Sequence, residues 1–173
     1  MNTKTRRIAI NVGGGYIPGM NAVVKGVTLA AAELGWEVVG IRNGFAGLLE
    51  PGDYPEGGLL NLSPQLAESL DPAASSVLGQ SPRVDPFHMR QLDEDGMVEE
   101  VDRSDELLAA LQAQGIGALV SVVGGRGLSI LHKLHRKGLN TVCIPRSLEN
   151  DIAATMVTLG FNSALSFTID MLD

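Results

Sequence analysis

The stretch "RRIAINVGGGYIPGMNAVVKGVTLAAAELGWEVVGIR", residues 6–42, holds a strand, a glycine-rich turn, a helix and a second strand in that order. Its first run, residues 6–12, is apolar and β-branched, and it ends at Gly13. Apolar residues then recur at helical spacing from Pro18 onward until Gly35, a typical residue at the end of a helix. A second apolar run starts at Trp36. This strand–helix–strand unit is typical of a parallel sheet, so the sequence predicts an α/β protein.

The later part of the chain repeats the alternation of helices and strands. In order it predicts a helix, a strand, a helix, a strand and a final helix, at residues 102–115, 118–125, 128–138, 140–145 and 162–172. Residues 43–102 are rich in Gly, Pro, Ser and acids, and we expect only a short helix at 63–70 and a short strand at 97–101. With no internal repeat or clear linker, residues 1–173 predict a single Rossmann-like, three-layer domain with a mainly parallel sheet and helices on both faces.

Composition limits the classes of partner. The 173 residues are 45% hydrophobic, which is typical of a folded domain, and the net charge of −7 leaves no basic stripe for nucleic acid. The N-terminal apolar run is too short for a signal peptide, and no segment has membrane-spanning length. The one cysteine, Cys143, lies in an apolar run and is expected to be buried. We therefore expect a cytoplasmic protein with no nucleic-acid or membrane partner.

Three polar or glycine-rich loops follow the ends of predicted strands. They are "GGGYIPGMN" (residues 13–21), "GGRGLS" (124–129) and "CIPRSLENDIAAT" (143–155). Ligands of open parallel sheets collect outside the carboxyl ends of the strands, so we expect these loops to converge. Glycine-rich turns that lead into helices suit phosphate, and Arg126 would add a positive charge. Taken singly, however, the first two fit an ordinary strand-to-helix turn equally well, and the third fits a surface turn better.

The third loop also carries two carboxylates two positions apart, Glu149 and Asp151. Glu149 is a candidate to accept a proton from a substrate hydroxyl, and Asp151 is a candidate to orient it or a metal. The pair therefore raises the hypothesis of phosphoryl transfer.

Taken together, the loops resemble the phosphofructokinase family in order and separation. The resemblance rests on "GGGYIPGMNAVVKGV", "VVGGRGLS" and "IPRSLENDI" followed by "TLGFNSAL", with "VVGIRNGFAGLLE" and "LGQSPRVDPF" between them. It implies a domain that holds the phosphates of ATP or pyrophosphate, for transfer to fructose 6-phosphate in glycolysis. Glu149 falls at the general base and Asp151 at its support. The residues that the resemblance implies for phosphate and nucleotide binding are Gly14, Gly15, Phe45, Arg83, Gly125, Arg126, Gly127, Arg146 and Ser147.

Several positions depart from the family pattern. Arg126 stands where the family has an acidic Mg²⁺ ligand, and an arginine cannot ligate a cation, so we expect no metal ligand here. Tyr16 replaces an aspartate of the first loop. Glu149 is one methylene longer than the family base, a displacement that can lower a rate about 10²-fold. Arg146 is basic, as in pyrophosphate-using members, whereas Gly127 fits ATP-using members, so the donor stays open.

The family chain continues into a further half that carries the fructose 6-phosphate contacts. Two hypotheses follow for these 173 residues. One is a partial or catalytically impaired phosphotransferase, and the other is a non-catalytic binding or assembly module, a pseudoenzyme. In both cases we expect a homo-oligomer, or a companion chain that supplies the missing half.

Overall fold

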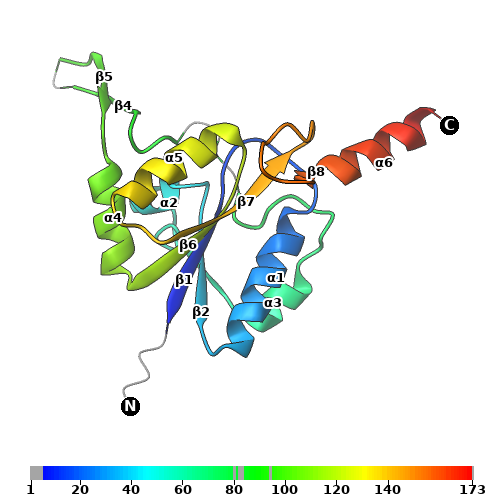
Figure 1. The fold of residues 1–173 in the computed structure, drawn as a ribbon. Coiled ribbons are helices and arrows are strands. Elements are labelled where there is room, and N and C mark those ends of the chain that lie inside the picture. Colours follow the sequence, from blue (N-terminus) through cyan, green and yellow to red (C-terminus); the bar gives the residue numbers. More distant parts are fainter. Residues whose placement is uncertain (1–5, 80, 82–83, 94, 173) are drawn as a thin grey trace.

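The computed structural model describes residues 6–79, 81, 84–93 and 95–172, which are built around one twisted sheet (Figure 1). Its six strands lie in the order β3-β2-β1-β6-β7-β8. They are β1 (Arg7–Val12), β2 (Glu37–Ile41), β3 (Leu59–Leu62), β6 (Ile116–Val123), β7 (Thr141–Ser147) and β8 (Leu159–Gly160). Within this sheet as described, β3 is antiparallel to its neighbour β2 and the other pairs are parallel. The predicted mainly parallel α/β fold is therefore confirmed.

Helices cover both faces of the sheet and make the three layers. Helices α1 (Met20–Glu33) and α3 (Pro64–Ser69) pack together on one face, and α2 (Ala46–Leu49), α4 (Ser104–Ala113) and α5 (Gly125–Arg136) lie on the other (Figure 1). Alternation along β1 explains the two cores. Ile8 and Ile10 pack with α1, whereas Ala9 packs with residues of α4 and α5. Successive strand side chains point to opposite faces, so an almost wholly apolar strand serves both cores.

Strand register brings the predicted loops to one edge. Val12 of β1 pairs with Val122 of β6, and Val123 pairs with Pro145 of β7, all in parallel. The loops that follow these three strands therefore leave the sheet side by side. A bridge between Gly13 and Ser81 adds the segment before β4 (Met89–Leu92) to the same edge.

Several boundaries differ from the sequence-based expectation. Helix α1 begins at Met20 and not at Pro18, because Gly19 has φ +89°, outside the helical region. Helix α5 begins at Gly125 and not at Leu128, so most of the second glycine loop is the first turn of a helix. The Leu128 N–H already donates to the Gly124 carbonyl at 3.0 Å. Strands β3 and β4, each four residues long, were not predicted.

The short helix α3 and the strand β5 (Val98–Val101) lie within the segments predicted for them. The side chain of Ser63 caps α3 by accepting from the Leu66 N–H at 3.1 Å. Strand β5 pairs with β4 in a hairpin that extends from the main body (Figure 1). A single turn, η1 (Pro51–Asp53), follows α2.

The predictions that the strand at residues 140–145 and its Cys143 are buried are wrong. Cys143 is exposed, and the side chain of Val142 beside it is 58% exposed. The sequence predicted burial of residues 140–145 because an apolar, β-branched run is typical of a strand that is covered on both faces. The final helix, α6 (Phe161–Leu172), buries none of its residues and projects away from the sheet (Figure 1), so it does not cover β7. No helix in the described part of the chain has the length and hydrophobicity to cross a membrane.

Candidate phosphate-binding site

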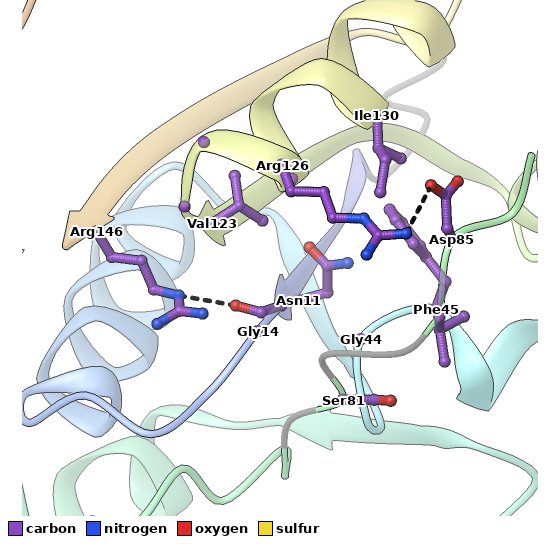
Figure 2. A pocket seen from close by; sticks show the side chains of 15 residues that line it. Asn11, Gly14, Gly44, Phe45, Ser81, Asp85, Val123, Arg126, Ile130 and Arg146 are labelled. Carbon is purple, nitrogen blue, oxygen red and sulfur yellow. Dashed lines mark hydrogen bonds and ion pairs between the residues drawn. The ribbon is translucent and has the colours of Figure 1, made fainter. Parts of the chain in front are cut away.

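A cavity of about 260 Å³ lies at the carboxyl edge of the sheet (Figure 2). Its walls come from the loop after β1, the first turn of α5, the end of β7 and the segment around residues 44–45. Most of the lining is glycine backbone and apolar side chain. Among the described residues, the charged groups that reach it are Asp85, Arg126 and Arg146.

Arg146 is the buried cation of this cavity. Its residue is 9% exposed, and its Nε donates to the Gly13 carbonyl oxygen at 2.8 Å. Among the described residues no carboxylate lies within ion-pair distance of it. Burial lowers the pKa of the Arg146 guanidinium from its ordinary value, yet an arginine keeps its charge at neutral pH. A buried charge without an acidic partner is unfavourable, so this position favours an anion.

Glycine stands at positions 14, 125 and 127 of the site for different physical reasons. A Cβ at Gly14 would lie 1.6 Å from Nη2 of Arg146, and Gly14 has φ +90°. A Cβ at Gly127 would lie 2.5 Å from the Cβ of Val123, so this glycine lets α5 approach β6. A Cβ at Gly125 would meet nothing within 4 Å. Gly14 is thus explained by its positive φ and by the close approach of Arg146, and Gly127 by packing against Val123, whereas Gly125 faces open space.

The first turn of α5 presents backbone donors to the cavity. Gly124, the N-cap, makes no side-chain cap, and Gly125, Arg126 and Gly127 all line the cavity. The first N–H groups of a helix have no partner within it, and the helix dipole adds positive potential there. Together with Arg146, this turn makes the cavity suitable for phosphate oxygens.

Arg126 and Asp85 face each other at the mouth of the cavity (Figure 2). Arg126 Nη2 lies 3.7 Å from Asp85 Oδ2, with the Arg126 side chain 76% exposed and that of Asp85 11% exposed. The positive charge of Arg126 therefore already balances the negative charge of a nearly buried carboxylate, so less of it is available to a ligand. Sequence reasoning missed Asp85, although an acid two residues after Arg83 in "PRVDPF" was a usable signal.

The floor of the cavity carries a polar pair between the two central strands. The Ser121 hydroxyl donates to Oδ1 of Asn11, and Asn11 is 1% exposed. Asn11 lines the cavity and its amide points into it (Figure 2), and the described residues offer its Nδ2 no acceptor. Sequence reasoning missed this residue as well. The signal was an asparagine inside an otherwise apolar strand.

The carboxylates after β7 are organised by one hydroxyl. Ser147, which is buried, places its Oγ 2.9 Å from Glu149 Oε2 and 2.5 Å from Asp151 Oδ1, and it accepts the Glu149 N–H at 3.1 Å. A hydroxyl has one proton, so it donates to one carboxylate at a time. Both carboxylates are exposed, and neither lines the cavity.

Asn150 holds the loop that carries these carboxylates. It has φ +54°, a conformation that asparagine tolerates better than most residues. Its side chain accepts the Thr158 N–H at 2.8 Å and donates to the Met156 carbonyl at 3.1 Å. The Thr158 hydroxyl donates to the Ser147 carbonyl at 2.9 Å. These bonds tie the loop to the start of β8.

With this geometry established, comparison with known proteins decides the family. A family model described as phosphofructokinase matches residues 7–173. The chain belongs to the phosphofructokinase family. Its fold agrees: the phosphofructokinase of Pichia pastoris in the T-state superposes with a TM-score of 0.76 at 26% identity, covering 97% of this chain and 18% of that chain.

Among phosphofructokinase relatives, both kinds of phosphoryl donor occur. The ATP-dependent 6-phosphofructokinase of Chloroflexus aggregans is 34% identical over 173 residues, all of this chain and 46% of that protein. The pyrophosphate–fructose 6-phosphate 1-phosphotransferase of Amycolatopsis methanolica is also 34% identical, over 96% of this chain and 44% of that protein. The chain thus spans about half the length of the curated relatives it matches.

The residues predicted from the phosphofructokinase resemblance divide into three groups. Six lie together around the cavity: Gly14, Phe45, Gly125, Arg126, Gly127 and Arg146. Four do not line it: Gly15, Ser147, Glu149 and Asp151. Arg83 lies outside the described residues. Within the described part of the chain, no cluster of three or more His, Cys, Asp or Glu residues could hold a metal ion.

Proposed function

We propose that this chain is the donor-binding part of a phosphofructokinase-type phosphotransferase, which holds the phosphates of ATP or pyrophosphate in the cavity beside Arg146. The observation that carries the proposal is the burial of the Arg146 guanidinium without an acidic partner among the described residues, next to the first turn of α5. Charge-assisted hydrogen bonds to such a group are about twice as strong as neutral ones. Phosphate oxygens would supply the missing acceptors.

The proposed reaction transfers the terminal phosphoryl group to the 1-hydroxyl of fructose 6-phosphate. The hydroxyl oxygen attacks the phosphorus, its proton passes to Glu149, and ADP or phosphate leaves. Asp151 would support Glu149 through the Ser147 hydroxyl that contacts both carboxylates. Asn150 would keep this loop in position.

Mg²⁺ normally assists phosphoryl transfer, but the residues at the mouth of the cavity do not fit it. Arg126 replaces the expected acidic ligand, and Asp85, the one carboxylate that the described residues place there, already faces Arg126 at 3.7 Å. A guanidinium repels a cation and cannot ligate it. We therefore derive no step through a metal ion. We propose ATP or pyrophosphate as the donor, a choice supported by one relative of each kind that is 34% identical to this chain.

The second candidate function is a non-catalytic module that binds nucleotide or phosphate for assembly. The Arg126–Asp85 pair favours it, because this pair removes metal binding while leaving Arg146 and the first turn of α5 available. The chain also spans about half of its relatives, so the sugar-phosphate contacts would come from further sequence, a companion chain or another copy. In either case the proposed setting is the cytoplasm, where these phosphate metabolites occur.

Calorimetric titration of the purified chain tests the proposal. We expect ATP or pyrophosphate to bind without added Mg²⁺, and we expect Arg146→Gln to weaken that binding about tenfold or more through loss of a charge-assisted contact. Arg136→Gln is the matched control, because Arg136 is exposed in the last turn of α5, away from the cavity. Equal binding by both variants would contradict the role of Arg146.

Turnover separates the two candidate functions. If the assembled protein phosphorylates fructose 6-phosphate and Glu149→Gln lowers the rate while donor binding persists, the transferase is supported. If donor binding persists and no assembly containing this chain turns over, the non-catalytic module is supported.

A further inference from the structure

A second and larger cavity lies at the opposite edge of the sheet. It has a volume of about 720 Å³ and is formed where β1, β2, β6 and β7 begin. None of the described residues that line it also lines the phosphate-binding cavity. We call it the basal cavity, and its volume is within the range typical of small-molecule sites.

Two arginines give the basal cavity a positive character. Arg6 stacks over the ring of Trp36 with its Cζ 5.4 Å from the ring centroid. Arg7 donates through Nη1 to the Gln114 carbonyl at 2.8 Å, and its Nε is 3.8 Å from Glu37 Oε2. Among the described residues, Glu37 is the one acid that lines the cavity, so the two guanidinium groups face a single carboxylate whose side chain is 62% exposed. Arg6 itself has no acidic partner within the described residues.

The rest of the wall is apolar and open. Ile8, Ala118 and the indole of Trp36 supply apolar surface, and Gly117 leaves space where a side chain would stand. A Cβ at Gly117 would meet only the Arg7 carbonyl oxygen, at 3.8 Å, which is an ordinary contact. An apolar cavity with a few polar groups on one side is the usual form of a site for small organic molecules.

We propose that the basal cavity binds a small organic anion that carries an apolar ring or chain. Its anionic group would pair with Arg6 and Arg7, whose charges Glu37 balances only in part. Its apolar part would lie against Ile8, Ala118 and Trp36. Such a ligand binds independently of the phosphate donor, because the two cavities are at opposite ends of the parallel strands.

Trp36 is the only tryptophan of the chain, so its fluorescence reports on this cavity. The probe is phenylphosphate, compared with inorganic phosphate and with phenol, which carry the charge and the ring separately. We expect a saturable change in Trp36 fluorescence with phenylphosphate at least about tenfold tighter than with either part alone. Calorimetry repeats the titration without relying on the fluorophore.

Two variants locate the binding. Gly117→Val places a side chain in the cavity, at a strand position where valine is favoured. Arg6→Gln removes one positive charge. We expect each variant to weaken phenylphosphate binding about tenfold. Gly26→Ala is the control, since a Cβ there meets nothing within 4 Å and Gly26 lies in α1. The proposal is overturned if phenol or phosphate alone binds as tightly as phenylphosphate. It is also overturned if Gly117→Val, folded by circular dichroism, binds phenylphosphate like the native chain.

Discussion

Arg146 donates from its Nε to the carbonyl oxygen of Gly13 at 2.8 Å, joining residues 133 positions apart across the edge of the sheet. The guanidinium occupies the space beside Gly14 that any side chain at that position would need. One arginine thus fixes the conformation of the first glycine loop and supplies the buried charge of the cavity.

Gly14→Ala is expected to destabilise the chain by about 1–2 kcal/mol, because its φ of +90° is unfavourable for alanine. It is also expected to displace Arg146 and weaken pyrophosphate binding. Unfolding in urea and calorimetry measure the two effects. In the double variant Gly14→Ala with Arg146→Ala, the backbone strain remains and the clash disappears. If the stability losses of the two single variants simply add, the contact between Gly14 and Arg146 is not energetically coupled.

Arg126→Asp is expected to make ATP binding depend on Mg²⁺. The new carboxylate would stand opposite Asp85, now 3.7 Å from Arg126, and two carboxylates at the cavity mouth are suitable ligands for Mg²⁺. Titrations of ATP with and without Mg²⁺ measure the change. Arg126→Asn, which removes the positive charge without adding a negative one, is the control. ATP binding that is equally insensitive to Mg²⁺ in both variants would show that the Arg126 position does not control metal binding.

Gly127→Ala is expected to lower the free energy of unfolding by about 1–3 kcal/mol, because its Cβ would lie 2.5 Å from that of Val123. Gly125→Ala, two residues earlier in the same helix turn, meets nothing within 4 Å and is expected to be neutral or slightly stabilising. Thermal unfolding compares the two. Equal melting temperatures for the two variants would rule out packing as the reason for glycine at position 127.

The start of α4 is expected to contribute stability that is lost in acid. Hydrogen bonds from the Ser104 side chain and N–H lower the pKa of Asp102 below its ordinary value of 3.8, and the Arg103 side chain lowers the pKa of Glu106 below 4.5. A carboxyl group with a lowered folded-state pKa stabilises the fold above its ordinary pKa, and this stability is lost as the pH falls through the folded-state value.

Asp102→Asn tests this acid dependence. It should be less stable than the native chain at neutral pH, and the difference should shrink as the pH falls below 3.8. Urea unfolding across that pH range measures it. A stability difference that stays constant with pH would contradict the assignment.

Helix α6 is expected to drive association. Phe167 is 66% exposed, and Leu165, Ile169 and Met171 are exposed on the same helix. Phe167→Glu should therefore reduce concentration-dependent association in sedimentation velocity, because the exposed apolar surface becomes smaller and charged. Ser166→Glu adds the same charge next to it and keeps the apolar residues. Identical sedimentation of the two variants would show that the charge, and not the loss of Phe167, is responsible.

The sequence predicted the α/β class correctly because its signals are local. Apolar β-branched runs, helical spacing and terminal glycines depend on neighbours a few residues apart, as at Gly35 and Gly115. The predicted element boundaries were wrong where a glycine-rich segment had two possible conformations. Gly125, for example, belongs to the first turn of α5 and not to a loop. The prediction that Cys143 is buried was wrong, because the exposure of this residue depends on whether another element packs over β7.

By itself, the sequence determined the family, the parallel arrangement and the three loops that meet at the carboxyl edge, since each is encoded in short motifs and their order. Only the tertiary structure decided which charges meet. It pairs Arg126 with Asp85 and leaves Arg146, held against Gly13, as the buried cation without an acidic partner among the described residues. The physical reason is that such contacts depend on strand register and on the approach of segments far apart in the chain, which local spacing does not encode.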